Sequence, residues 1–203
     1  MQEYLSALNT NKKKLILILL IIVGAIEPFL FPGSAYAATA YLRTDRMGST
    51  VATGGTVCMT PTTALTEGKV IVTFPGAGTQ SATSYGVNST AGNWTVNTTN
   101  IPTGSTAWVG IATATGVTGA AVTFTSGDLV VSTQYCFNFV STSTLTLPTG
   151  ANTNNTGTIV TQTGASPAID SVSYATSNIA SNGDQITVTA SVPSTFTMTL
   201  SGT

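Results

Sequence analysis

Alternation of apolar and polar residues is the main pattern along this chain. Segments such as KVIVTF (69–74), AAVTFT (120–125) and QYCFNFV (134–140) carry apolar side chains at every second position, which is the period of a β-strand. No segment after residue 37 shows a sustained apolar repeat of 3.6 residues. The same alternation predicts further strands at residues 93–99, 157–163, 184–192 and 195–201. We therefore expect an all-β protein.

Turn residues separate these strands, as in Pro75-Gly76, Pro102-Thr103-Gly104 and Asn182-Gly183-Asp184. Many short strands with frequent turns and no helices are typical of a β-sandwich or a barrel. From about Gln162 the stretch QTGASPAIDS predicts a linker or a long turn. The strands that follow it are too few for an independent domain.

The pattern therefore divides the chain into three parts. Residues 1–37 are a leader, residues 38–163 are a sandwich, and residues 164–203 hold a linker and further strands. Those last strands either complete the first sandwich or belong to an incomplete second one, and both alternatives stay open.

The leader has the order of a secretory signal. Lys12 to Lys14 form the positive flank, Leu15 to Ile26 form the apolar run, and Ala35 to Ala37 supply small residues before a cleavage site. The apolar run is shorter than the roughly 20 residues of a membrane-spanning helix. We expect cleavage after Ala37 and a secreted or cell-surface protein. The alternative is an uncleaved anchor, in which case the leader is the contact with the membrane.

Charge is scarce after the leader. The 166 residues from Ala38 on hold 40 threonines, three cations and five carboxylates, which leaves a net charge of −2. The charged residues are Arg43, Arg46 and Lys69, and Asp45, Glu67, Asp128, Asp170 and Asp184. Three scattered cations exclude nucleic acid as a partner, since phosphate backbones require clustered positive charge. Threonine, β-branched and with a hydroxyl, suits the solvent face of a strand.

The chain has two cysteines, Cys58 and Cys136, both in strand-like segments, and no histidine. In an exported chain this predicts a disulfide with Cα atoms about 4.4 to 6.8 Å apart. The alternative is two separate buried thiols. We expect no metal and no cofactor, because no histidine or further cysteine completes a site. Nucleophiles that depend on histidine are excluded, and five widely spaced carboxylates do not favour a glycosidase pair, so we expect a protein that is not an enzyme.

The segments GTVCMTP, VIVTFPGAG, IPTGSTAWVGI, VTFTSGDL and TQYCFNF, in this order, resemble strands of immunoglobulin-like domains from exported bacterial surface proteins of the adhesin, cell-wall or filament type. The resemblance extends from about Ala40 to Thr163. It implies an immunoglobulin-like β-sandwich in which the disulfide joins an early strand to a late one and staples the two sheets. It also implies a display, adhesion or assembly role. Trp94 and Trp108 both lie far after Cys58, so neither is assigned as the core tryptophan of a variable domain.

Two functions fit these features. The first is a structural or adhesive surface module, whose partners are other surface proteins, cell-wall glycans or further copies joined by strand addition. The alternative is a carbohydrate-binding module, in which aromatic rings stack on sugars and amides bond their rims. The residues that would contact the glycan are Trp94, Trp108, Tyr85, Asn93 and Asn97. Exposed rings favour sugar binding, and buried rings favour a scaffold.

Four asparagines begin the Asn-x-Ser/Thr pattern, namely Asn88, Asn93, Asn97 and Asn154. In an exported protein of a glycosylating host each is a candidate N-glycosylation site. A chain this rich in threonine and asparagine produces some of these matches by chance.

Overall fold

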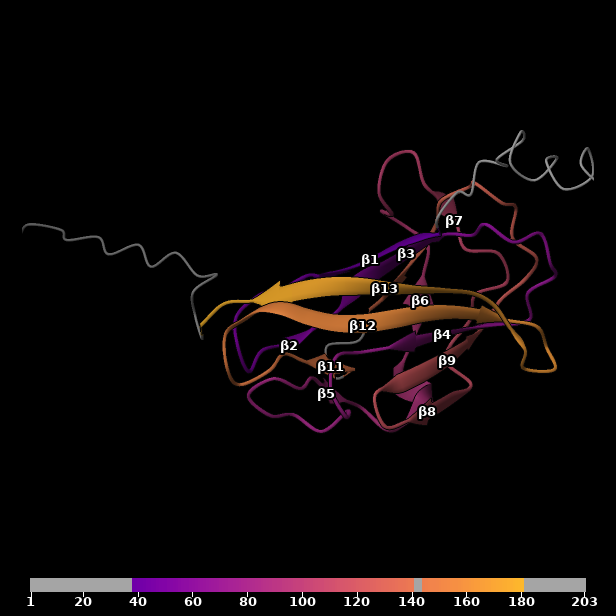
Figure 1. Ribbon diagram of the computed structural model, residues 1–203. Coiled ribbons are helices and arrows are strands. Elements are labelled where there is room, and N and C mark those ends of the chain that lie inside the picture. Colours follow the sequence, from indigo (N-terminus) through magenta and orange to yellow (C-terminus); the bar gives the residue numbers. More distant parts are fainter. Residues whose placement is uncertain (1–37, 141–143, 181–203) are drawn as a thin grey trace, which may run out of the picture. The chain divides into compact units, whose positions relative to one another are not determined.

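The computed structural model describes residues 38–140 and 144–180 (Figure 1). This part of the chain holds thirteen strands and one short 3₁₀ turn, η1 (Ala91–Asn93). The strands are β1 (Thr39–Thr44), β2 (Ala52–Thr53), β3 (Gly55–Thr60), β4 (Lys69–Thr73), β5 (Gly86–Val87), β6 (Val96–Asn97), β7 (Thr106–Ala107), β8 (Gly116–Thr118), β9 (Ala121–Thr125), β10 (Tyr135–Phe139), β11 (Leu145–Thr146), β12 (Asn152–Gln162) and β13 (Ala168–Asn178). The predicted all-β class is confirmed, whereas the immunoglobulin-like topology stays a prediction.

The strands form three sheets. One sheet has the order β1-β3-β10-β6, with β7 pairing in parallel with β10. A second has the order β13-β12-β4-β9-β8, and a small third sheet has the order β2-β11-β5. Every pairing apart from that of β7 is antiparallel. In Figure 1 the indigo strands β1 and β3 lie above β13, β12 and β4.

One hydrophobic core joins the two five-stranded sheets. In β4, Val70 and Val72 are buried, and the residues between them are only partly buried, as the alternation predicts. They lie opposite Phe124 and Val122 of β9. The other sheet contributes Val57 and Met59 of β3 and Phe137 and Phe139 of β10 to the same core. The alternating pattern therefore sets which face of each strand is buried.

Two predicted segments differ from the structure. Residues 93–99 were expected to form one strand, but only Val96–Asn97 pairs, and the 3₁₀ turn before it carries Trp94 into the core. Part of the predicted linker after Gln162 is strand β13, which pairs with β12 over almost its whole length. The division into domains stays a prediction, because residues 184–192 and 195–201 lie outside the described residues, as does the leader.

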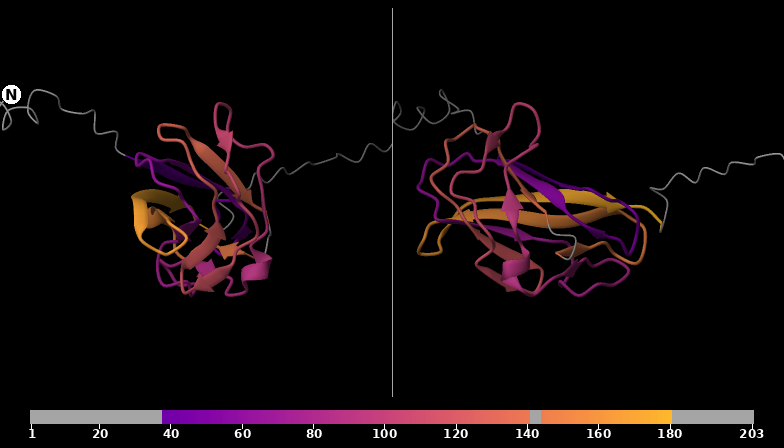
Figure 2. Two further views of the ribbon diagram at one scale, coloured as in Figure 1. Left: turned by 90° about the vertical axis from the view of Figure 1, so that its right-hand side faces the viewer. Right: turned by 180° about the vertical axis from the view of Figure 1, so that it is seen from behind.

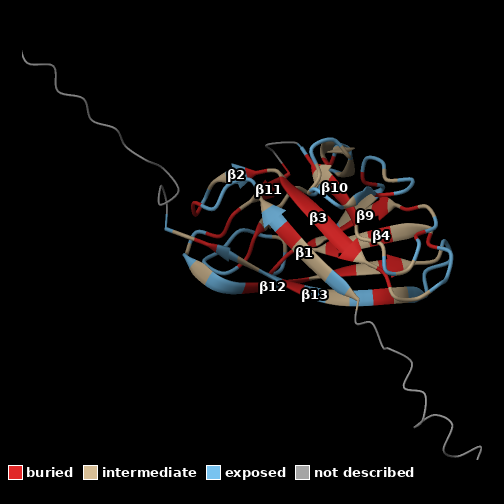
Figure 3. Ribbon diagram, turned by 90° about the horizontal axis from the view of Figure 1, so that it is seen from above, coloured by how far each residue is buried: buried red, intermediate tan, exposed pale blue. Residues whose placement is uncertain are grey.

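The β12–β13 hairpin carries the two longest strands, and Figure 3 shows buried and exposed residues alternating along them. Gly157 of β12 lies directly opposite Tyr174 of β13. The Tyr174 hydroxyl donates a hydrogen bond to the Thr73 carbonyl of β4, with 3.0 Å between the oxygens. The tyrosine therefore reaches across β12 and ties three neighbouring strands together.

A short segment, residues 47–49, holds the end of β13; we call it the clasp. The Ile179 amide donates to the Met47 carbonyl at 2.9 Å, and the Ser49 amide donates to the Ile179 carbonyl at 2.9 Å. The Asn178 side chain donates to Ser49 Oγ at 3.0 Å and to the Gly150 carbonyl at 2.6 Å. The views in Figure 2 show β13, in yellow, beside β1, which leads into the clasp.

Across residues 38–140 and 144–180, no helix has the length and apolar character needed to cross a membrane.

Candidate functional site

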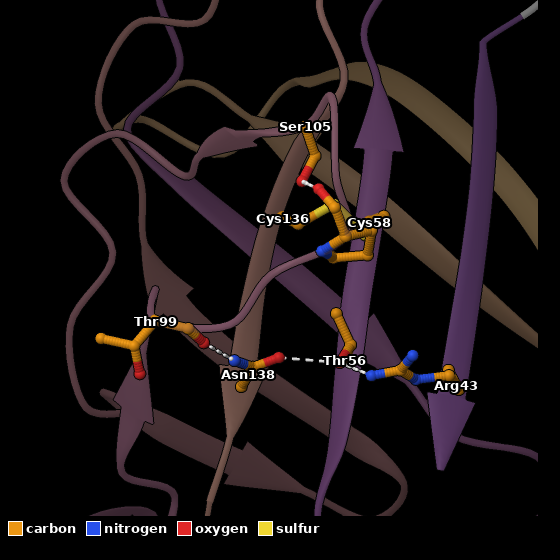
Figure 4. Close-up of a disulfide and its surroundings, with 8 residues drawn as sticks. Arg43, Thr56, Cys58, Thr99, Ser105, Cys136 and Asn138 are labelled. Carbon is orange, nitrogen blue, oxygen red and sulfur yellow. Dashed lines mark hydrogen bonds between the residues drawn. A yellow bond between two sulfur atoms is a disulfide. The ribbon is translucent and has the colours of Figure 1, made fainter. Parts of the chain in front are cut away.

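The disulfide lies in the middle of the first sheet. Cys58 of β3 and Cys136 of β10 are directly opposite each other, their Cα atoms are 4.2 Å apart, and both residues are fully buried (Figure 4). That distance is slightly below the expected range and is close to the roughly 4.5 Å of a non-hydrogen-bonded antiparallel pair. The predicted pairing is present in the structure, but the expected bridge between two sheets is wrong. The bond joins neighbouring strands of one sheet.

The disulfide and the residues two positions before or after each cysteine, Thr56 and Asn138, lie on the face of the sheet that points away from the core. Side chains alternate along a strand, so Val57 and Phe137 face the core while Thr56 and Asn138 share the outer face with the cystine. The loop between β6 and β7 lies over this face, and Figure 4 shows Ser105 near the disulfide. The Ser105 hydroxyl donates to the Pro102 carbonyl at 2.5 Å, which closes the loop on itself.

A chain of hydrogen bonds extends across this outer face. The Asn138 amide nitrogen donates to the Thr99 carbonyl at 2.6 Å and to Asn97 Oδ1 at 3.1 Å. Its oxygen accepts a bond from the Thr56 hydroxyl at 2.7 Å, and Arg43 donates to that hydroxyl at 3.4 Å. Asn138 therefore fixes the β6–β7 loop to the centre of the sheet.

Beside this chain lies a surface hollow of about 250 Å³, which we call the polar hollow. Its wall includes one cation, one carboxylate and three amides, contributed by Arg43, Asp45, Asn97, Asn100 and Asn138. Such groups can hold a hydroxyl-rich or amide-bearing molecule by hydrogen bonds. Thr56 and Phe139 also line it, but both are 1% exposed.

The aromatic residues predicted to contact a glycan are in the core instead. Trp94 and Tyr85 are 0% exposed and Trp108 is 2% exposed. Trp94 Nε1 donates to the Asn88 carbonyl at 2.9 Å, Trp108 Nε1 donates to Ser126 Oγ at 2.9 Å, and the Tyr85 hydroxyl pairs with that of Thr176 at 2.9 Å. The predicted sugar-stacking role of these three rings is therefore wrong, because no face of any ring is open to a ligand.

These rings form two packed groups. Trp94 lies with its centroid 5.2 Å from Phe74 and 5.7 Å from Phe139. Trp108 meets Phe137 edge-to-face at 5.5 Å. Aromatic pairs at these separations stabilise a core beyond the area that they bury. The alternation of residues 93–99 signalled a half-buried segment but could not show that the tryptophan faces inward.

The four sequon asparagines differ in their surroundings. Asn154 is exposed on β12, whereas Asn88, Asn93 and Asn97 are partly buried. Asn97 Oδ1 accepts bonds from the Thr99 amide at 3.2 Å and from the Thr99 hydroxyl at 3.1 Å, in addition to that from Asn138. Among the five predicted glycan contacts, Asn97 lines the polar hollow. Use of the sequons for glycosylation stays a prediction.

The remaining members of the hollow were missed by sequence reasoning. They come from four separate segments, and Thr56 meets Asn138 only because β3 pairs with β10 in this register. No local motif marks such a set, since the signal is a pairing between distant strands.

Two buried carboxylates, Asp170 and Glu67, have a structural role. Asp170 accepts four hydrogen bonds, two from backbone amides and two from hydroxyls of Thr62 and Thr63, at 2.9 to 3.1 Å. Burial raises its pKa, but these bonds outweigh burial and hold the pKa below the ordinary 3.8. Glu67 accepts one bond from the Leu129 amide at 2.9 Å, and no partner for its buried Oε1 is found in the described residues. Burial, with help from Asp128 and Asp170, raises the Glu67 pKa above 4.5.

Within the described ranges, no group of three or more Asp, Glu, Cys or His side chains is arranged to hold a metal ion.

Comparison with known proteins gives little. No protein-family model matches the chain, and no curated protein matches it. Among solved structures, the chain is similar to the crystal structure of BslA, a bacterial hydrophobin, with 15% identity and a TM-score of 0.41. The match covers 73% of this chain and 98% of that one. We base no argument about fold or function on a likeness of this size.

Proposed function

We propose that this chain is an exported structural or adhesive module without enzymatic activity, built as an immunoglobulin-like β-sandwich and assembled or displayed at the cell surface. The observation that carries the proposal is the fully buried disulfide between β3 and β10. Disulfides form and persist in oxidising compartments outside the cytosol. The leader predicted over residues 1–37 supplies the route to such a compartment.

The composition and the core support a scaffold. Thr73 of β4 and Thr123 and Thr125 of β9 lie at outward, partly buried positions, which β-branched residues with a hydroxyl suit. The large aromatic rings are used in packing. Two five-stranded sheets around one core support the sandwich, although a disulfide inside one sheet departs from the immunoglobulin pattern.

The test is the location and the first residue of the protein made in a bacterial host from the full sequence. We expect it outside the cytoplasm, beginning at Ala38, with both cysteines protected from alkylation until reduction. Replacing Ala35 and Ala37 by Asp should block cleavage, whereas Tyr36→Ser, between the two recognised positions, should not. Protein that stays in the cytoplasm with free thiols would overturn the proposal.

Carbohydrate binding is a second candidate, now favoured only by the polar hollow. Its mixture of amides with Arg43 and Asp45 has the chemistry of a site for hydroxyl-rich ligands. The assay is retention on purified cell-wall glycan of the mature chain and of Arg43→Ala, with Arg46→Ala as the matched control. Loss of retention in Arg43→Ala alone supports a site in the hollow, and no retention of the unmodified chain excludes it for this glycan.

A further inference from the structure

Four polar residues form one row across the outer face of the first sheet. Arg43 of β1 lies directly opposite Thr56 of β3, and Thr56 lies opposite Asn138 of β10. Asn138 in turn lies opposite Asn97 of β6. Side chains that are directly opposite on neighbouring strands share one face of a sheet. The row therefore lies along the polar hollow, which all its members line, and Figure 4 shows Arg43, Thr56 and Asn138 in sequence.

The hydrogen bonds along this row all have the same direction. Arg43 donates to Thr56, Thr56 donates to Asn138, and Asn138 donates to Asn97. Both hydrogens of the Asn138 amide nitrogen are used, because it also donates to the Thr99 carbonyl. Asn138 therefore holds its neighbours in place, and the donors that remain for a ligand lie at the two ends of the row, on Arg43 and Asn97.

At one end, the Asn97 side chain is held in a single orientation. Its Oδ1 accepts bonds from the Thr99 amide at 3.2 Å, from the Thr99 hydroxyl at 3.1 Å and from Asn138 at 3.1 Å. A backbone amide can only donate, so the side-chain atom that faces it is the oxygen, and the other arm of the amide is the nitrogen. No acceptor for that nitrogen is found among the described residues. Asn97 therefore offers a ligand a fixed donor.

At the other end, two charged side chains line the hollow without a charged partner. Arg43 carries several N–H donors, and the described residues show one bond from them, the 3.4 Å bond to Thr56. In the same part of the chain the Asp45 carboxylate accepts no hydrogen bond and forms no ion pair with Arg43, although both side chains are exposed at the hollow. A guanidinium in this state suits a carboxylate, which it can bind with paired hydrogen bonds, and the Asp45 carboxylate suits hydroxyls.

The hollow is small and has one apolar side. Its volume of about 250 Å³ is below the roughly 300 to 1,000 Å³ of pockets for drug-sized molecules, so it suits a single sugar unit. Val140, which is 46% exposed, lines it and offers an apolar surface to the C–H groups of a sugar ring. Because Trp94, Trp108 and Tyr85 are buried, recognition here depends on hydrogen bonds and charge.

We propose that the polar hollow binds one carboxylate-bearing sugar unit of a surface glycan. Arg43 binds the carboxylate, Asp45 accepts hydrogen bonds from ring hydroxyls, and the Asn97 amide donates to a further sugar oxygen. This inference rests on the proposed function, since an exported chain meets such glycans, and it names the ligand class that the second candidate leaves open.

The first test compares two sugars that differ in one group. The mature chain, residues 38–203, is titrated with methyl glucuronoside and with methyl glucoside, and binding is followed by NMR of the amide signals. We expect the acidic sugar to bind about 10- to 100-fold more tightly, because hydrogen bonds to a charged group are the stronger ones, and this advantage should shrink as salt is added. Equal binding of the two sugars, or no binding of the acidic one, would overturn the inference.

Two competitors separate a sugar from other sources of a carboxylate. Acetate carries the carboxylate alone, and acetylglycine resembles the end of a peptide. Neither should displace methyl glucuronoside at an equal concentration, because neither offers ring hydroxyls to Asp45. Displacement by acetate would show a site for any carboxylate, displacement by acetylglycine alone would show a peptide site, and either result would overturn the inference.

Variants locate the site. Arg43→Gln should abolish the difference between the two sugars, whereas Lys69→Gln removes the same charge from β4, outside the hollow, and should leave the difference intact. Asn97→Asp keeps the oxygen that accepts the three bonds and replaces the free donor by a negative charge, so it should weaken the acidic sugar more than the neutral one.

Thermal unfolding checks that each variant is folded. A folded Arg43→Gln or Asn97→Asp variant that distinguishes the sugars as the unmodified chain does would overturn the inference. Export and cleavage are measured separately, so a correctly exported chain that binds neither sugar leaves the proposed function standing.

Discussion

Asp170 and Glu67 are both buried carboxylates, yet their surroundings have opposite effects. The Asp170 carboxylate accepts four hydrogen bonds, which attach the Thr62–Thr63 loop to β13. Those bonds favour the ionised form of Asp170. Glu67 has one such bond and two carboxylates nearby, and its ionised form is disfavoured. From the sequence, both residues were interpreted only as two of five widely spaced carboxylates. Their partners, two threonines and a leucine, carry no sequence pattern that marks them as hydrogen-bond donors to a carboxylate.

Replacing Asp170 by Ala should lower the free energy of unfolding by about 2 to 3 kcal/mol at neutral pH, because buried amides lose a charged acceptor. Its pKa is lower in the folded state than the ordinary 3.8, so its contribution is present above pH 3.8 and is lost as the pH falls through the folded-state value. Urea unfolding at pH 7 and at pH 3 measures this. The exposed Asp45→Ala is the control, and an unchanged stability in Asp170→Ala would contradict the assigned role.

The Glu67 pKa should be above 4.5 in the folded protein and should fall when Asp128 becomes Asn, because one source of repulsion is removed. A raised pKa means that the contribution of Glu67 to stability is present below pH 4.5 and is lost as the pH rises through the folded value. Carboxyl NMR titration measures the shift. Asp45→Asn should leave it in place, and a Glu67 pKa at or below 4.5 in the unmodified protein would refute the expectation.

At the scale of elements, prediction was best where apolar residues face a core. β4, β9 and β10 occur almost where the alternation placed them, because valine and phenylalanine mark their inner faces. β13 was missed because its inner face carries Asp170, Thr176 and Asn178, polar residues that are satisfied by hydrogen bonds which the sequence does not show. On that face only Val172 and Tyr174 continue the hydrophobic alternation, which is too short a pattern to predict an eleven-residue strand.

Gly157→Ala should destabilise the protein by about 1 to 3 kcal/mol, because a methyl group there would overlap the Tyr174 ring and the Thr73 carbonyl. Gly116→Ala on β8 is the matched control, since nothing lies within 4 Å of the added carbon. Thermal unfolding followed by circular dichroism compares the two. Equal midpoints would show that Tyr174 does not pack as described.

At the scale of the whole molecule, the pairing of the cysteines could be predicted from their number, but their place could not. Two cysteines in an exported chain imply a disulfide. Whether that disulfide lies within one sheet or bridges two sheets depends on which distant strands are neighbours, and the sequence does not show this. The positions of the two tryptophans could not be predicted either. Alternation shows that one face of a strand is buried, but it does not show whether a tryptophan lies on the buried or on the exposed face. The polar hollow depends on the pairing of β3 with β10, and of its residues only Asn97 was among the predicted glycan contacts.

Removing the disulfide in the double variant Cys58→Ala and Cys136→Ala should cost roughly 4 kcal/mol, because a loop of this length no longer restricts the unfolded chain. Guanidinium unfolding of the variant and of the oxidised protein gives the difference. A cost below about 1 kcal/mol would mean that the bond adds nothing that the β3–β10 pairing does not already supply.

The bond between β3 and β10 also sets how the molecule bears a pulling force. Tension applied between its two ends passes from Cys58 through the sulfur atoms to Cys136, so the segment between them, a separation of 78 residues, carries no load. Under oxidising conditions a stretched molecule should therefore release a length shorter by about 260 Å, at 3.3 to 3.6 Å for each shielded residue. Single-molecule stretching with and without reductant reads this hidden length directly. A pulling force therefore extends only the segments outside the bond, whereas the residues between Cys58 and Cys136 remain in a closed loop.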